Sequence, residues 1–292
     1  MVREGTVSVD RRTVGFADFG PPDGEPVIWC HGGPGSRLEP TQTEAAAASA
    51  GLRLIGIDRP GYGLSTPQPG RSIAGWATDA IAVADELGLG EFAAVGVSTG
   101  GAYALALAAL REQRVTGVVV CCGLTDMAWS GARDGMPRLG TMTVWEAESR
   151  EEALAASAEL WGEDGSSMPA PERPLAPADM ALFSDATWLQ GAMATAAARW
   201  TFGVQGYTDD RIADGGGWRS FEVGRIRCPV LVVHGGADSM VPVAHARHTA
   251  AIVPGARLQV YEDDGHISVI RHVVPALTEL ISSRDADADA SS

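Results

Sequence analysis

A chain of 292 residues with 45% hydrophobic and 20% charged residues has an ordinary globular composition, and it is long enough to bury a large core. The net charge of −15 argues against nucleic acid as a partner, because binding to phosphates requires a basic surface. The sequence contains neither a run of about 18 apolar residues that could span a bilayer nor the apolar stretch of a secretory signal. We therefore expect a cytoplasmic protein that binds neither nucleic acid nor membranes.

The first part of the chain alternates apolar strands with helical segments. The expected strands are Thr6–Val9, Arg12–Phe19, Val27–Cys30, Leu54–Asp58, Phe92–Val97 and Val115–Cys122. The expected helices are Thr43–Ala50, a helix capped by Ser72 and ended near Gly88, and Gly100–Arg111. This alternation is typical of βαβ units around a mostly parallel sheet with helices on both faces.

The alternation stops between residues 127 and 218. This segment has no clean strand, a proline-rich stretch and six tryptophans, which are Trp129, Trp145, Trp161, Trp188, Trp200 and Trp218. We expect residues 127–218 to form a helical lid inserted into a core made of residues 1–126 and 219–284. Two more strands, Pro229–His234 and Arg257–Tyr261, and a closing helix near Ile267–Ser283 complete that core. Residues 285–292 are polar and lack aromatic side chains, so we expect a disordered tail.

The strongest chemical signal is a G-x-S-x-G motif, in which Ser98 lies between Gly96 and Gly100. The motif falls between an expected strand and an expected helix, which is the context that a nucleophilic serine at a sharp turn requires. Such a turn strains the backbone and leaves room only for very small neighbours, which the glycines supply. Ser98 is therefore the candidate nucleophile.

A serine hydroxyl is a weak nucleophile until a base removes its proton. Of the six histidines, His266 follows the last expected strand, at the edge of the sheet where Ser98 also lies. His31 precedes the first glycine loop and is expected to be structural. His245, His248 and His272 fall in expected helices, where surface or packing roles are expected, and His234 ends an expected strand.

A carboxylate should orient the histidine and stabilise its protonated form. Asp238 follows the strand before His266, and the order Ser98, Asp238, His266 is that of α/β hydrolases. Asp126, just past the strand Val115–Cys122, is the rival for this role. The sequence leaves the choice between these two carboxylates open.

The reaction also needs backbone donors for a developing oxyanion. The segment His31-Gly32-Gly33-Pro34-Gly35 follows an expected strand and offers a tight glycine loop. We expect the N–H groups of Gly33 and Thr99 to form this oxyanion hole.

These segments together resemble the α/β-hydrolase superfamily, and HGGPGS with DRPGYGLS is most similar to its proline-iminopeptidase-related and esterase members. The resemblance implies a sheet of about eight strands and a lid above the active site. It also implies structural roles for Asp58 and Arg59. Iminopeptidase-like members need lid carboxylates that hold the substrate's free amine, and the acidic residues available here are Glu146, Glu148, Glu151, Glu152, Asp209 and Asp210.

The predicted function is hydrolysis of a carboxylic ester or small amide through an acyl-enzyme, with no cofactor and no metal. One alternative is an aminopeptidase that prefers N-terminal proline, and another is a non-catalytic receptor for a small ligand on the same fold. Lyase or acyltransferase chemistry on the same residues also stays open, because a fold does not fix a function. The tryptophans of the lid favour a largely apolar pocket for a small or medium-sized substrate.

Overall fold

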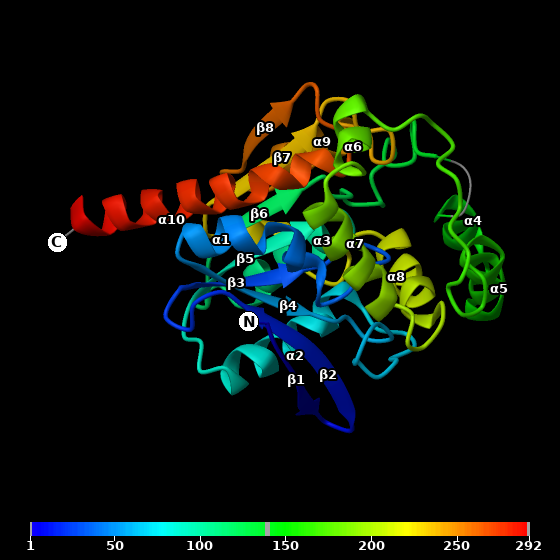
Figure 1. Ribbon diagram of the computed structural model, residues 1–292, viewed down its shortest axis with the longest axis horizontal. Coiled ribbons are helices and arrows are strands. Elements are labelled where there is room, and N and C mark those ends of the chain that lie inside the picture. The colour runs from blue at the N-terminus through cyan, green and yellow to red at the C-terminus, as the bar shows by residue number, and fades with distance from the viewer. Residues whose placement is uncertain (1, 138–140, 291–292) are drawn as a thin grey trace.

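The computed structural model describes residues 2–137 and 141–290, and in them eight strands form one sheet (Figure 1). Their order across the sheet is β1-β2-β4-β3-β5-β6-β7-β8. The first three are joined by antiparallel pairing and all later neighbours are parallel. The strands are β1 (Arg3–Val9), β2 (Arg12–Phe19), β3 (Glu25–Cys30), β4 (Leu52–Ile57), β5 (Phe92–Val97), β6 (Val115–Cys121), β7 (Val230–Gly235) and β8 (Arg257–Tyr261). The predicted mostly parallel α/β sheet is confirmed.

Successive residues of a strand point to opposite faces of a sheet, and in this sheet both faces are apolar and covered. In β3, Ile28 and Cys30 belong to the core beneath α2 (Ile73–Glu86) and α3 (Gly100–Leu110). Val27 and Trp29 belong to the opposite core, which contains residues of α1 (Glu44–Ser49) and α10 (Val273–Ala290). The helix α9 (Ala244–Ile252) packs against β7 and β8.

The two ends of helix α2 have the residues and geometry that the sequence predicts. Ser72 caps α2, where its hydroxyl accepts a hydrogen bond from the N–H of Gly75 at 3.1 Å. Gly88 follows α2 with a left-handed φ of +66°. The predicted helix Thr43–Ala50 is shorter, since a 3₁₀ turn, η1 (Glu39–Thr43), precedes α1.

Five helices lie between β6 and β7, within the segment for which we predicted a lid. They are α4 (Thr141–Glu146), α5 (Arg150–Trp161), α6 (Pro177–Leu182), α7 (Ala186–Ala198) and α8 (Gln205–Gly215). Helix α8 packs against α4 and α5, which lie farther from the sheet (Figure 1), and α7 packs on η1. Residues 138–140 of this segment lie outside the described part of the chain.

The end of the chain differs from the expected disordered tail. After a 3₁₀ turn, η3 (Ser268–His272), helix α10 continues to Ala290 and projects beyond the sheet (Figure 1). Residues 291–292 lie outside the described residues. In the described residues no helix combines the length and apolar character needed to cross a membrane.

Candidate active site

Ser98 lies directly after β5, in a turn that bends sharply into α3. Its backbone has a left-handed φ of +52°, which is strained for a residue with a side chain. A Cβ atom on Gly96 would lie 2.3 Å from the carbonyl oxygen of Gly100, and a Cβ on Gly100 would lie 2.0 Å from that of Cys30. The glycines of the motif are therefore required by close backbone packing around the serine.

The glycine loop after β3 lies against this turn. A Cβ atom on Gly33 would lie 2.7 Å from Thr99 Oγ1, and one on Gly32 would lie 3.7 Å from the Cβ of Ser98. Thr99 is the N-cap of α3, where the positive end of the helix dipole meets the loop. The two predicted oxyanion residues, Gly33 and Thr99, are thus neighbours in space beside Ser98.

Buried polar side chains hold the glycine loop in place. The carboxylate of Glu39 accepts hydrogen bonds from the N–H of Gly32 at 3.0 Å and from Trp29 Nε1 at 2.6 Å. The guanidinium of Arg59 donates to the carbonyl oxygens of His31 and Gly32. The sequence analysis did not identify Glu39, whose partners are set by the turn after β3 and not by any motif.

His31 has the structural role that we expected. Its Nε2 accepts a hydrogen bond from the N–H of Arg59 at 3.1 Å, so Nδ1 carries the proton that it shares with the carbonyl oxygen of Gly32. Burial and the Arg59 charge lower the pKa of His31 well below its usual value, so the ring stays neutral. The neighbouring Asp58 accepts hydrogen bonds from the N–H groups of Arg37 and Leu64, which is a structural role as well.

His266 lies in the loop between β8 and η3, and its Nδ1 is 2.7 Å from Asp238 Oδ2. The other carboxylate oxygen of Asp238 accepts hydrogen bonds from the N–H groups of Met240 and Val241, each at 2.8 Å. The Asp238 side chain is fully buried, and although burial raises the pKa of its carboxyl, the charge and hydrogen bond of His266 hold that pKa below its usual value. An ionised Asp238 is thus fixed at both oxygens.

The Asp238 carboxylate also controls the proton affinity of His266. Burial by itself would lower the pKa of the imidazole, but the charge of Asp238 and their hydrogen bond raise it well above 6.5. The Cys122 thiol contacts the same ring, and burial raises the pKa of Cys122 far enough to keep it a neutral thiol. Asp238 is therefore the group that stabilises the protonated histidine.

The rival carboxylate, Asp126, has other partners. Its Oδ1 accepts hydrogen bonds from the N–H groups of Ala128 and Trp218, both at 2.9 Å. Ala128 and Trp218 lie near the two ends of the segment for which we predicted a lid, so Asp126 ties these ends together. The geometry places Asp238, and not Asp126, at His266.

His234 is buried beside the site, with its Nε2 3.4 Å from Asp238 Oδ2 and 2.9 Å from the carbonyl oxygen of Val241. The other histidines pack elsewhere. His245 Nδ1 accepts a hydrogen bond from the N–H of Thr125, and the ring of His248 stacks on Trp129. His272 Nε2 lies 2.8 Å from Asp264 Oδ2, and its ring stacks on Tyr261. In the part of the chain that is described, no three His, Cys, Asp or Glu side chains gather as a metal site requires.

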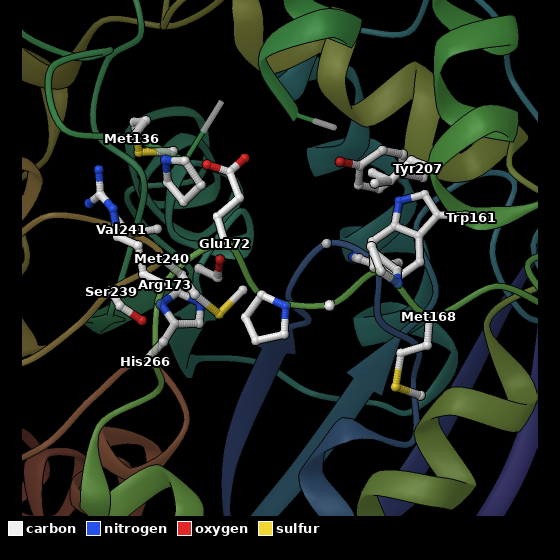
Figure 2. A pocket seen from close by; sticks show the side chains of 18 of the residues that line it. Met136, Trp161, Met168, Glu172, Arg173, Tyr207, Ser239, Met240, Val241 and His266 are labelled. Atoms are coloured by element: carbon white, nitrogen blue, oxygen red, sulfur yellow. The ribbon is translucent and has the colours of Figure 1, made fainter. Parts of the chain in front are cut away.

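Ser98, Gly33 and His266 line one cavity of about 760 Å³. Figure 2 shows His266 with Met240 and Val241 on one side of this cavity, and Trp161 with Tyr207 on the other. Most of the lining is apolar. Of the six tryptophans in the inserted segment, only Trp161 lines the cavity; the others include Trp218 in the main core and Trp145, which donates to Asp214.

One carboxylate of the inserted segment positions the loop that carries His266. Asp179 on α6 accepts hydrogen bonds through Oδ1 from the N–H groups of Ile267 (3.2 Å) and Ser268 (2.8 Å). A Cβ on Gly265 would lie 2.2 Å from Asp179 Oδ2, so only glycine permits this approach. The two partners are separated by 88 residues in sequence, and no local pattern indicates the contact.

The acidic residues that were considered as amine ligands are engaged elsewhere or lie outside the cavity lining. Asp210 is fully buried and ion-pairs with Arg59 at 2.7 Å and with Arg71 at 2.6 Å. Asp209 accepts two hydrogen bonds from Arg150. The described carboxylates that line the cavity are Glu159 and Glu172, both exposed.

The fold and the site geometry define an α/β hydrolase. A family model described as alpha/beta hydrolase fold matches residues 25–273, so the chain belongs to this family and is an enzyme that acts on ester or amide bonds.

The chain is similar to known proteins over most of its length or over part of it. A non-heme chloroperoxidase of Streptomyces lividans is 32% identical over 92% of this chain and 95% of its own length. A proline iminopeptidase of Neisseria gonorrhoeae is 31% identical over 42% of each chain. The solved structure of a thermophilic esterase from Thermogutta terrifontis has the same fold, with a TM-score of 0.68 and 21% identity over 97% of this chain and 99% of that one.

Proposed function

We propose that this enzyme hydrolyses carboxylic esters, or small amides, through an acyl-enzyme formed on Ser98, with His266 as general base and Asp238 as its orienting acid. One observation carries the proposal. The strained Ser98 and the Asp238-bound ring of His266 line the same cavity. The unpaired state of all four cysteines agrees with the reducing cytoplasm, where we expect the enzyme to act on a small molecule.

In the first half of the reaction, Asp238 holds the proton of His266 on Nδ1, so Nε2 keeps its lone pair. Nε2 takes the proton of Ser98 as the serine oxygen attacks the carbonyl carbon. The carbonyl becomes an oxyanion, which accepts hydrogen bonds from the N–H groups of Gly33 and Thr99. His266 then protonates the leaving alcohol or amine, and the acyl group remains on Ser98.

In the second half, water replaces the leaving group. His266 removes one of its protons as the water oxygen attacks the acyl carbon, and it returns that proton to Ser98 as the acid is released. Apart from water, the groups that act in this cycle are side chains and backbone N–H groups of the chain itself.

The rival functions differ in what they require from the cavity. An iminopeptidase needs carboxylates for a free amine. Asp209 and Asp210 are occupied by arginines, and the carboxylates that line the cavity, Glu159 and Glu172, are exposed. A receptor would bind its ligand without turnover. The ester hydrolase is therefore the function that the geometry supports best.

Labelling with a fluorophosphonate, together with turnover of acyl nitrophenyl esters and proline nitroanilide, tests the proposal. Wild-type protein should be labelled and should prefer the esters, whereas Ser98→Ala should lose both labelling and turnover. Ser239→Ala is the matched control, because Ser239 lines the same cavity and should leave Ser98 open to labelling. Preference for the anilide would favour the iminopeptidase, and labelling without turnover would favour the receptor.

A further inference from the structure

The cavity contains a buried cation that the proposed mechanism does not use. Arg211 lies on α8, its side chain is 3% exposed, and it lines the same cavity as Ser98 and His266. We propose that Arg211 binds a carboxylate of the substrate, so that the preferred substrates are esters with a carboxylate in the acyl chain, a few bonds from the scissile carbonyl. This inference rests on the proposed function.

The position of Arg211 relates it directly to the reacting carbonyl. Its Nη2 donates to Thr99 Oγ1 at 2.5 Å, and a Cβ on Gly33 would lie 3.1 Å from the same nitrogen. Arg211 thus bonds to Thr99 and lies next to Gly33, the two residues whose N–H groups we assign to the oxyanion hole. A substrate carboxylate that meets the guanidinium would lie within a short chain of the carbonyl held there.

The hydrogen-bonding groups of Arg211 are incompletely paired. Nη2 also meets Asp214 Oδ2 at 2.6 Å, but Nε is buried and finds no acceptor among the described residues. Burial and the nearby Asp210 raise the pKa of Asp214 to about 6, although the Arg211 charge opposes that rise. Asp214 also accepts a hydrogen bond from Trp145 Nε1, so its carboxylate is shared between Arg211 and the indole.

Arg211 belongs to a wider ionic cluster around α8. In the described chain, the buried or half-buried ion pairs around α8 combine four arginines with three aspartates, and Asp209 and Asp210 each pair with two of the arginines. The members are Arg59, Arg71, Arg150, Arg211, Asp209, Asp210 and Asp214. Arg150, whose side chain is 33% exposed, supplies the extra cation, so the buried arginines and aspartates of this cluster balance in number. Arg211 differs from Arg59 and Arg71 in that it lines the cavity.

The rest of the lining favours a ligand that carries one charged group and is otherwise apolar. The lining of the cavity is mainly apolar, with Leu124, Leu160 and Val241 among its residues. The carboxylates of the lining, Glu159 and Glu172, are exposed and would repel an anion placed near them. The planar fork of an arginine matches the two oxygens of a carboxylate.

A matched pair of methyl esters tests the inference. Monomethyl succinate carries the carboxylate, and methyl 4-methylpentanoate replaces its two oxygens by methyl groups in the same shape. Wild-type kcat/KM, followed by pH-stat, should favour monomethyl succinate. In Arg211→Gln this ratio should fall by about tenfold to a hundredfold, as expected for the loss of hydrogen bonds to a charged group.

Two further variants separate local contact from general charge. Arg211→Lys should keep part of the preference, because it keeps the charge but loses the fork. Arg173→Gln removes an exposed cation of the same cavity and should leave the ratio within about twofold. An equal drop in Arg173→Gln, or a wild-type preference for the neutral ester, would overturn the inference while leaving the hydrolase assignment intact.

A binding experiment distinguishes failure of the inference from failure of the proposed function. Calorimetry with Ser98→Ala should show binding of monomethyl succinate, and the double variant Ser98→Ala, Arg211→Gln should lose it. Binding that depends on Arg211, in a wild-type protein that turns over no ester, would support the anion site and refute the hydrolase. Equal binding to both variants would refute the anion site.

Discussion

Replacing Asp238 by asparagine should disable the enzyme through the tautomer of His266 without disturbing the fold. Oδ1 of Asp238 accepts two backbone hydrogen bonds at 2.8 Å, so the oxygen of an asparagine amide will occupy that position. The amide NH₂ must then take the place of Oδ2, 2.7 Å from His266 Nδ1. A donor at this point forces Nδ1 to become an acceptor and moves the ring proton to Nε2, which faces the serine in our mechanism.

The expected loss in kcat is about a thousandfold to ten-thousandfold, which is the size found when a serine protease triad is given the wrong tautomer. Kinetics with a methyl or nitrophenyl ester would measure it, and the melting temperature should change little. Asp126→Asn is the matched control and should keep activity within about threefold, since an amide oxygen can still accept from Ala128 and Trp218. Retention of more than a tenth of wild-type kcat in Asp238→Asn would refute the assignment.

We expect Asp238→Asn to change the pH dependence of kcat/KM as well. The base must be neutral, so kcat/KM should rise with pH through the pKa of His266, which Asp238 holds above 6.5. Removing the carboxylate removes the main stabilisation of the protonated ring, and the rising limb of the residual activity should move to lower pH. A limb that stays at the same pH in Asp238→Asn would contradict the electrostatic role of Asp238.

Three other substitutions test the supports of the site. Gly33→Ala places a methyl group 2.7 Å from Thr99 Oγ1 and should lower kcat by about a hundredfold, measured with a nitrophenyl ester; unchanged kcat would remove Gly33 from the oxyanion hole. Asp179→Ala leaves two backbone N–H groups without their acceptor and should lower both kcat and the melting temperature, whereas Asp179→Asn should retain most of each. Asp210→Asn breaks buried ion pairs and should cost about 3–5 kcal/mol of unfolding free energy in urea titrations, and a cost below about 1 kcal/mol would contradict the buried network.

The core could be predicted from the sequence because its signals are local. The expected strands β5 and β8 have the same bounds in the structure. The G-x-S-x-G spacing located the strained turn at Ser98. Each of these features depends on residues within about ten positions of one another. The position of His266 followed from the rule that parallel strands end at one edge of the sheet.

The parts that escaped prediction depend on contacts between distant segments. Nothing near Asp179 in sequence indicates a partner 88 residues away. Asp210 was considered as a ligand for an amine because the sequence shows an acidic residue there. The arginines that neutralise it, Arg59 and Arg71, lie far earlier in the chain, so the sequence does not show that they are its partners. The tryptophans could not be sorted by sequence either, since an indole that lines a cavity and one that packs a helix have the same pattern.

These distant contacts give the inserted helices a structural part in the site. Asp179 holds the loop after β8 that carries His266, and Asp210 fixes Arg59, whose guanidinium donates to the glycine loop. Arg211 bonds the side chain of Thr99. Three separate loops of the core therefore each depend on a charged residue from the insertion. Because the proposed mechanism requires oxyanion donors that are already in place, we expect the insertion to contribute to rate as well as to the shape of the cavity.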